Sequence, residues 1–321
     1  GQLRLVSEIQ RTMVTIEPFA VGHLRISTLF HPLEVTGGDY VEAFKTDTGL
    51  LVASSADATG HGVSAALFAM IYKTLFHGSL KNTYSPAKML ELINRDFIQT
   101  SMVEGYYLTA SIIVMDPRTG NILAVASRPH YEPYRYPEYA QNGQDMLFRD
   151  PAISVPYEPG SVLKVVTVAA ALDSGRVDVN WSYNDTGQLE YGGVLIRNSS
   201  GGAYGQQDLQ GILDHSLNVG VATLSTRVMG ADLFYTHIPA FGFGQVTGIE
   251  MTGEACGLVH LPTDWDWSDS NLATNPFGQG IAVTPLQMAT AVCAIANDGV
   301  MMQPHIVAER RYPDGRLIPI P

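Results

Sequence analysis

"GYYLTASIIVMDPRTGNILAVASRP", residues 105–129, has the pattern of two strands joined by a tight turn. The apolar run from Leu108 to Met115 is rich in β-branched residues, which favour strands. The DPRTG segment (116–120) places Pro early and Gly last, as a turn requires, and the apolar pattern then resumes. These residues predict a β-hairpin, while the segments before and after it point to different chemistries.

The composition bounds the possible functions. The chain has 321 residues, 45% hydrophobic and 16% charged, with a net charge of -12. This length can bury a sizeable core and suggests about two domains. The acidic balance argues against nucleic acid as a partner, because binding it requires a basic patch. No apolar run reaches the ~20 residues that span a bilayer, so we expect no membrane segment here. Cys256 and Cys293 form no zinc or redox pattern and are expected to be buried.

Residues 1–109 predict alternating strands and helices. Residues 3–14 have the apolar spacing of a short lead-in helix. Strands are expected within LRISTLFHP (24–32) and DYVEAFKTDTGLLVASSAD (39–57), with TDTG (46–49) as a hairpin turn. Two helices follow, and Ser85 and Pro86 are a good cap and first position for the second.

Residues 110–321 have a different sequence pattern. The stretch 129–157 is rich in Pro and Tyr and is expected to be an irregular surface excursion. Helices are then predicted to begin at Ser161, Asp208 and Pro285, with Thr284 capping the last.

The sharpest local signal is YEPGSVLKVVTVAAAL (157–172). A Pro-Gly turn places Ser161 at the start of a predicted helix. Lys164 follows it by three residues, one helical turn later and on the same face. A partly desolvated lysine beside a hydroxyl can accept its proton, which suits an activated nucleophile. Ser and Lys three residues apart are also common by chance, so a solvent-facing pair is the alternative.

A second signal strengthens the first. DHSLNVG (214–220) places Ser216 and Asn218 at a loop or helix edge. Such a pair can relay a proton to a leaving group and hold a substrate amide. The segment NPFGQGIAVTPLQMATAVCAIANDG (275–299) then adds a Gly-rich turn, a strand and a capped helix.

Together these strings resemble the transpeptidase domain of class B penicillin-binding proteins. The matching segments are VMDPRTGNILAVASRP, EPGSVLK, YGGVLIRNSSGGAYG, HSLNVG, FGFGQVTGIEMTGE and GQGIAVTPLQMATAVCAIANDG. The resemblance implies a serine acyltransferase in which Ser161 is acylated by the D-Ala-D-Ala end of a peptidoglycan stem peptide or by a β-lactam. It implies that Lys164 is the base and that Ser216 and Asn218 assist proton transfer and substrate placement.

One element of that family pattern is missing. No Lys-Thr-Gly or Lys-Ser-Gly tripeptide follows Ser216, so the transpeptidase-like domain is expected to be truncated before this third box. In the family the strand that carries the box supplies one of two oxyanion donors, and losing one such donor typically costs about 10²–10³ in rate. We therefore expect impaired activity, or none.

The N-terminal residues suggest a second chemistry. Asp39 and Asp57 each lie near a strand end beside glycines, so two carboxylates and a carbonyl could converge on Mg²⁺ or Mn²⁺. Two such residues are more often turn formers. The segments EVTGGDYVEAF (34–44) and SSADATGHGVSAALFAMI (54–71), with SEIQRTMV before them and SPAKMLELINRDFIQT after, resemble the N-terminal half of bacterial PPM-type serine/threonine phosphatases.

That second resemblance implies a two-metal centre that activates water for hydrolysis of a phosphoprotein. Asp39 and Asp57 would be ligands, with help from the Ala58 carbonyl, while His61 is expected to structure its loop. Only two of about four carboxylates of the family are matched. The transpeptidase-like part implies an extracytoplasmic location and the phosphatase-like part a cytoplasmic one.

These observations leave three hypotheses. The chain is a penicillin-binding acyl-serine enzyme with an unusual N-terminal module, a metal-dependent phosphatase with a replaced second half, or an inactive fusion of two partial domains. We predict an α+β fold. Residues 110–321 should form a transpeptidase-like antiparallel sheet with flanking helices, and residues 1–109 a partial phosphatase-like α/β-sandwich module. The shared hairpin strand marks the expected splice point.

Overall fold

A computed structural model describes residues 19–21, 24–26, 39–45, 51–58, 62–83, 85–100, 108–128, 132–199, 201–312 and 314–319. The predicted lead-in helix at 3–14, the TDTG turn and His61 lie outside these residues. The chain divides into two compact units, which are described separately. The first is Gly1–Met115 with Ile122–Ala152, and the second is Asp116–Asn121 with Ile153–Pro321.

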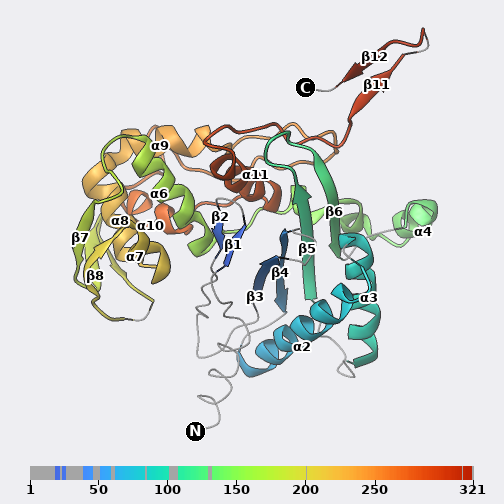
Figure 1. Ribbon diagram of the computed structural model, residues 1–321, viewed down its shortest axis with the longest axis horizontal. Helices are drawn as coiled ribbons and strands as arrows, with labels where there is room; N and C mark the ends of the chain where they lie inside the picture. The colour runs from blue at the N-terminus through green and yellow to red at the C-terminus, as the bar shows by residue number, and fades with distance from the viewer. Residues whose placement is uncertain are drawn as a thin grey trace. The chain divides into compact units, whose positions relative to one another are not determined.

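The first unit is built on a four-stranded antiparallel sheet (Figure 1). In order across the sheet, its strands are β3 (Asp39–Lys45), β4 (Leu51–Ala58), β5 (Leu108–Met115) and β6 (Ile122–Arg128). A separate hairpin joins β1 (Phe19–Val21) to β2 (Leu24–Ile26). β5 and β6 are the hairpin that residues 105–129 predict, and Gly120 ends its turn at a φ of 82°.

The sheet continues across the predicted boundary between residues 109 and 110. β5 pairs with β6 on one side and with β4 on the other, where Ser55 lies opposite Ser111 and Ala58 opposite Leu108. The boundary therefore falls inside a strand whose two neighbours come from the two predicted modules.

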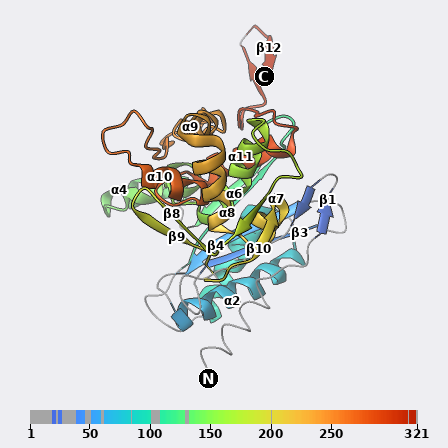
Figure 2. The same cartoon turned by 90° about the vertical axis from the view of Figure 1, so that its left-hand side faces the viewer.

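Two helices lie against this sheet, as the sequence predicts. α2 (Gly62–Leu80) packs on β3 and β4 (Figures 1 and 2), while α3 (Pro86–Thr100) packs on β5, β6 and α2 (Figure 1). The fully buried Tyr40 of β3 anchors the contact, with its ring 5.3 Å from that of Tyr72 and 6.4 Å from that of Phe76, measured between centroids. Edge-on aromatic pairs of this kind stabilise a core beyond the area that they bury.

The stretch after β6 is more regular than predicted. It contains short helical turns, η1 (Pro133–Arg135), α4 (Tyr136–Gln141), η2 (Asp145–Phe148) and α5 (Pro151–Ser154). Pro137 lies in the first turn of α4, where its fixed φ favours a helix, and Arg135 pairs with Glu138 at 2.8 Å. The predicted surface location is confirmed by the exposed Tyr134 and Met146.

The second unit is mainly helical. Its helices are η3 (Gly160–Leu163), α6 (Lys164–Asp173), α7 (Leu209–Asp214), α8 (Asn218–Thr223), the π-helical η4 (Leu224–Met229), α9 (Gly230–Ala240), α10 (Asp269–Thr274), η5 (Asn275–Phe277) and α11 (Pro285–Ala296). Three antiparallel hairpins accompany them: β7 (Ser182–Asp185) with β10 (Gly205–Asp208), β8 (Gln188–Tyr191) with β9 (Val194–Arg197), and β11 (Glu309–Arg311) with β12 (Leu317–Pro319).

The predicted helix starts are confirmed in this unit. Asp208 caps α7 by accepting a hydrogen bond from the Gly211 N–H at 2.7 Å. Thr284 and Gln287 form a reciprocal capping box at the start of α11, with bonds of 2.8 and 3.2 Å. Ser161 lies in the 3-10 turn η3, which directly precedes α6, and Gly160 at the start of this turn adopts a φ of 56°.

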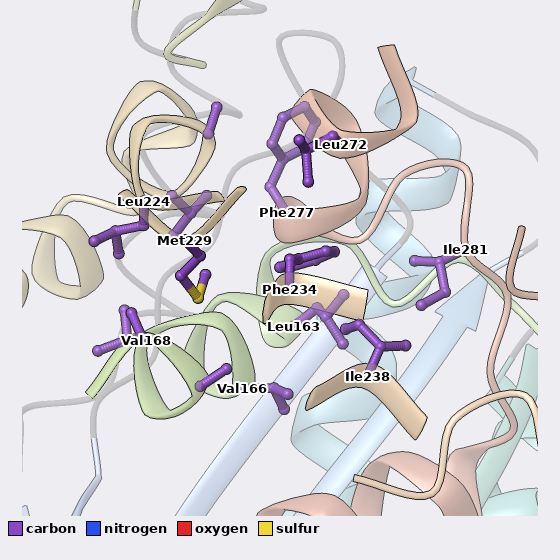
Figure 3. Packing of buried hydrophobic residues seen from close by; sticks show 14 of the residues in the cluster. Leu163, Val166, Val168, Leu224, Met229, Phe234, Ile238, Leu272, Phe277 and Ile281 are labelled. Atoms are coloured by element: carbon purple, nitrogen blue, oxygen red, sulfur yellow. The ribbon is translucent and has the colours of Figure 1, made fainter. Parts of the chain in front are cut away.

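The core of the second unit surrounds α6, as predicted for the helix of Ser161. Leu163 and Val166 are completely buried and belong to one cluster with Phe234 and Ile238 of α9 (Figure 3). Burying an aliphatic side chain of this size contributes roughly 1.5–3 kcal/mol. The lysine that starts α6 is therefore attached to one of the most tightly fixed elements of the unit.

The overall fold class is the predicted one, an α+β arrangement with an antiparallel sheet and flanking helices. The expectation for the cysteines is wrong in part. Cys256 is exposed because it lies in the loop before α10, and Cys293 is half-buried on α11. Among the described residues, no helix combines the length and hydropathy needed to cross a bilayer.

Candidate active site

The turn that carries Ser161 is fixed from both sides. Tyr157 exchanges two backbone hydrogen bonds of 2.9 Å with Val283, and the Gly160 N–H donates to the Gly278 carbonyl at 3.1 Å. Ser161 itself is exposed, and its carbonyl accepts the backbone N–H of Lys164. A hydroxyl held on a rigid turn and open to solvent is available to a substrate.

Lys164 is buried although it is a lysine. Only 2% of its surface is exposed, and its Nζ donates to the Ser216 carbonyl at 2.6 Å and to the Ser216 Oγ at 2.7 Å. The structure therefore brings together two predicted site residues that lie 52 positions apart. The alternative of a solvent-facing lysine is wrong.

Burial also changes the proton affinity of this amine. Desolvation lowers the pKa of Lys164 from 10.5 to about 7, because the charged form loses its hydration. No neighbouring charge among the described residues contributes to the shift. A substantial fraction of Lys164 is therefore neutral at physiological pH and can accept a proton.

Ser216 is held in an unusual conformation. Its φ is 50°, in the left-handed region that side chains other than glycine rarely adopt, and only 4% of its surface is exposed. Such strain persists only where surrounding contacts enforce it, and it is frequent at functional sites. The conformation directs both the carbonyl and the hydroxyl of Ser216 to the Lys164 amine.

Asn218 is the first residue of α8, two positions after Ser216. It is half-buried, and its Nδ2 donates to the Arg197 carbonyl at 3.0 Å. Asn218 thus follows Ser216 closely along the chain, and its hydrogen bond to the last residue of β9 fixes the side chain. Its role in holding a substrate stays a prediction.

Comparison with known proteins identifies the family of the chain. Residues 110–316 match the family model of the penicillin binding protein transpeptidase domain, which is more than half of the chain. The chain belongs to this transpeptidase family.

Similar transpeptidases share this region at moderate identity. The penicillin-binding protein PbpB of Mycolicibacterium smegmatis is 36% identical over 205 residues, which cover 64% of this chain and 31% of that protein. Stage V sporulation protein D of Bacillus subtilis is 34% identical over 198 residues, 61% of this chain and 30% of that protein. The chain thus spans about a third of the length of these relatives.

A solved transpeptidase structure gives the same fold. The crystal structure of penicillin binding protein 3 from Mycobacterium tuberculosis, complexed with ampicillin, superposes with a TM-score of 0.58 at 37% identity. The match covers 66% of this chain and 45% of that one.

Sequence reasoning missed one part of the candidate site. The turn of η5 supports the Ser161 turn and α6, since Thr167 Oγ1 donates to the Pro276 carbonyl at 2.8 Å and Glu158 accepts the Gly280 N–H at 2.9 Å. A Cβ on Gly278 would lie 2.2 Å from the Gly160 carbonyl oxygen. The glycine-rich run was visible in the sequence, but its partner lies more than one hundred residues earlier.

The predicted metal ligands meet by strand pairing. Asp39 of β3 lies directly opposite Asp57 of β4 in the antiparallel register. Opposite residues lie on the same face of a sheet, with Cα atoms about 4.5–5.5 Å apart. The side chains of Asp39, Asp57 and Ala58 lie outside the described part of the structure. Among the side chains it describes, no group of three or more His, Cys, Asp and Glu could hold a metal.

A second family model overlaps the transpeptidase match. Residues 47–167 match stage II sporulation protein E, which is less than half of the chain. The two matches share residues 110–167, which include the whole hairpin of β5 and β6 apart from the first two residues of β5. The hybrid resemblance predicted from the sequence is supported on both sides of that hairpin.

Proposed function

We propose that the chain is a penicillin-binding serine acyltransferase of the D,D-transpeptidase type. The observation that carries the proposal is the buried amine of Lys164, which follows Ser161 by one turn, contacts Ser216 and has a pKa lowered to about 7. The proposed substrates are a peptidoglycan stem peptide ending in D-Ala-D-Ala and β-lactams. The proposed location is extracytoplasmic, where peptidoglycan is assembled.

In the proposed reaction, the Ser161 Oγ attacks the carbonyl carbon of the penultimate D-Ala while Lys164 accepts the hydroxyl proton. The peptide C–N bond breaks, and the departing D-Ala amine takes a proton relayed from Lys164 through the Ser216 hydroxyl. An acceptor amine then attacks the acyl-Ser161 ester and releases the serine. With a β-lactam, the ring C–N bond breaks instead and the acyl-enzyme persists.

The 321 residues contain no candidate for the third box of the family. The Ser161 N–H remains as one oxyanion donor, and the absence of a second would slow acylation by about 10²–10³. We therefore propose that these residues are acylated slowly.

A fluorescent penicillin tests this proposal. We expect slow covalent labelling of the chain, and we expect Ser161→Ala to abolish it. Ser174→Ala is the matched control, because Ser174 caps the other end of α6, where its hydroxyl donates to the Ala171 carbonyl and accepts from the Arg176 N–H. Labelling that persists in Ser161→Ala, or a complete lack of labelling in the parent, would contradict the proposal.

A specific observation favours a second candidate function for the first unit. Asp39 and Asp57 are directly opposite one another in the strand register. Because Mn²⁺ and Mg²⁺ prefer oxygen ligands, we propose that these two residues and the Ala58 carbonyl would hold the metal. A bound metal pair would activate water for hydrolysis of a phosphoprotein. This candidate is a PPM-type phosphatase activity with a cytoplasmic location.

The phosphatase candidate has its own test. Mn²⁺-dependent hydrolysis of a phosphopeptide should disappear in Asp57→Asn and remain in Asp145→Asn, a change at an exposed acidic residue of the same unit. Activity that survives Asp57→Asn would refute it. Negative results in both assays would leave the third candidate, an inactive fusion of two partial domains.

A further inference from the structure

We propose that Asp185 and Asn198 are positioning residues that hold Ser216 against Lys164. The inference rests on the proposed acyltransferase function, and it concerns groups that touch neither the substrate nor the Lys164 amine. It starts from the N-terminus of α8, the helix that follows Ser216 directly.

α8 has no capping side chain of its own. Its N-cap residue is Leu217, which cannot accept a hydrogen bond from the first turn. The Val219 N–H instead donates to the Asn198 Oδ1 at 3.1 Å. A residue 21 positions earlier therefore supplies the cap that this helix start requires.

The orientation of the Asn198 amide is set by two acceptors, a buried carboxylate and the Gly202 carbonyl, which accepts from the Asn198 Nδ2 at 3.2 Å. Asp185 is 1% exposed, and its Oδ2 accepts from the Asn198 Nδ2 at 2.9 Å. The Asp185 oxygens accept from Asn198, Tyr204 and Tyr183, so this side chain favours the amide orientation that turns the NH₂ toward Asp185. The amide oxygen then faces the Val219 N–H.

Asp185 is itself fixed by two further donors. The Tyr204 N–H donates to its Oδ2 at 2.9 Å, and the Tyr183 hydroxyl donates to its Oδ1 at 3.2 Å. The same Tyr183 oxygen lies 2.7 Å from the position that a Cβ on Gly220 would occupy, so it packs closely on α8. The carboxylate thus links β7, the segment between β9 and β10, and the start of α8.

Ser216 needs such support because its left-handed conformation is unfavourable. If the start of α8 loosens, the strain at Ser216 can relax, and its carbonyl and hydroxyl move away from Lys164. Water then reaches the amine. Because desolvation is what holds the Lys164 pKa low, hydration should raise it.

The test is a titration of Lys164 in the full chain. The ¹³Cε signal of Lys164 is assigned by its absence in Lys164→Arg and followed against pH. We expect a midpoint near 7 in the parent. In Asp185→Asn the new NH₂ can compete with the Val219 N–H for the Asn198 oxygen, and we expect the midpoint to rise by about one pH unit, the scale of one hydrogen bond.

Three further variants separate positioning from general stability. Asn198→Ala removes the acceptor of the Val219 N–H and should also raise the midpoint. Tyr183→Phe, a milder change that keeps the packing, should shift it upward by a smaller amount and serves if Asp185→Asn does not fold. Thr290→Val removes a buried hydrogen bond in α11 and should leave the midpoint unchanged.

The outcomes are distinct. A folded Asp185→Asn or Tyr183→Phe variant with the parental Lys164 midpoint would overturn the proposal, and so would a parental midpoint in a folded Asn198→Ala variant. Failure of fluorescent penicillin to label the parent would reject the proposed function, while the titration would still decide whether the two residues position Ser216.

Discussion

Lys164 combines a sequence motif with a tertiary environment. The motif places it one turn after Ser161, but only the fold surrounds its amine with buried groups and turns the Ser216 oxygens toward it. The pKa of Lys164 is therefore about 7 in the folded chain, compared with about 10.5 for a lysine in an unfolded chain. This difference in pKa should affect the pH dependence of both the acylation rate and the free energy of unfolding.

The first prediction at the residue scale concerns catalysis. If Lys164 is the base, only its neutral form accepts the Ser161 proton. The rate constant of acylation by fluorescent penicillin should therefore fall about tenfold per pH unit below the pKa and level off above it. The measurement is the labelling rate from about pH 5 to about pH 9. A rate that is flat across this range would exclude Lys164 as the base.

The second prediction at this scale concerns stability. Between about pH 7 and pH 10.5 the unfolded chain carries a proton on Lys164 that the folded chain lacks, so the free energy of unfolding should increase with pH in this window. Lys164→Met should reduce the slope by about 1.4 kcal/mol per pH unit. Urea unfolding at several pH values measures this, and Lys88→Met, at an exposed position, should keep the slope.

At the scale of elements, the contact between η5 and the Ser161 turn depends on the absence of a side chain. Gly278 has a φ of 79°, and an added Cβ would meet the backbone of Gly160 at 2.2 Å. The contact is between backbone and backbone, so neither segment can relieve the clash by rotating a side chain. The turn that carries Ser161 must therefore move if Gly278 is replaced.

This argument predicts that Gly278→Ala slows acylation of Ser161 and destabilises the second unit by about 1–3 kcal/mol or more. Gly299→Ala is the matched control, since Gly299 also has a positive φ, of 84°, but has open space at its Cβ position. It should show only a conformational cost of about 1 kcal/mol and normal acylation. Labelling rates and thermal unfolding of both variants provide the comparison.

The packing of α2 on the sheet leads to another prediction. Phe76 is fully buried and stacks on Tyr72 with ring centroids 6.0 Å apart. Phe76→Ala should destabilise the first unit by about 3–5 kcal/mol, because it leaves a cavity in this core. Leu67→Ala, on the half-exposed side of the same helix, should cost much less. Urea unfolding followed by far-UV circular dichroism tests the difference.

At the scale of the whole molecule, the sheet does not end at the predicted module boundary. β5 bonds to β4 before that boundary and to β6 after it. The family matches also overlap through this hairpin, so the two resemblances share one strand pair rather than meeting at a linker.

We predict that residues 1–152 retain the four-stranded sheet as a fragment and that residues 1–109 do not. The shorter fragment loses β6 and nearly all of β5, which leaves β4 as an open edge that promotes association. Circular dichroism and size-exclusion chromatography should show a folded monomer for 1–152 only. A monomeric, folded 1–109 fragment would instead support a module that ends before the hairpin.

Much of the fold was predictable because local signals were strong. The hairpin at 105–129, the start of the second N-terminal helix at Pro86 and the Thr284 cap depend on turn chemistry and side-chain periodicity within a few residues. The helical turns at 133–154 were missed, because Pro and Tyr there resemble an irregular segment. The exposure of Cys256 was missed because burial is not a local property.

The sequence alone determined the types of the elements and the chemical groups available to the candidate site, since propensity, capping and motif spacing are local. It placed Ser161 and Lys164 one helical turn apart and named Ser216 and Asn218. Only the tertiary structure decided that Lys164 is desolvated, that Ser216 adopts a left-handed conformation, and that Asp185 and Asn198 support it. Desolvation and hydrogen-bond geometry depend on groups from distant segments, which local patterns do not specify.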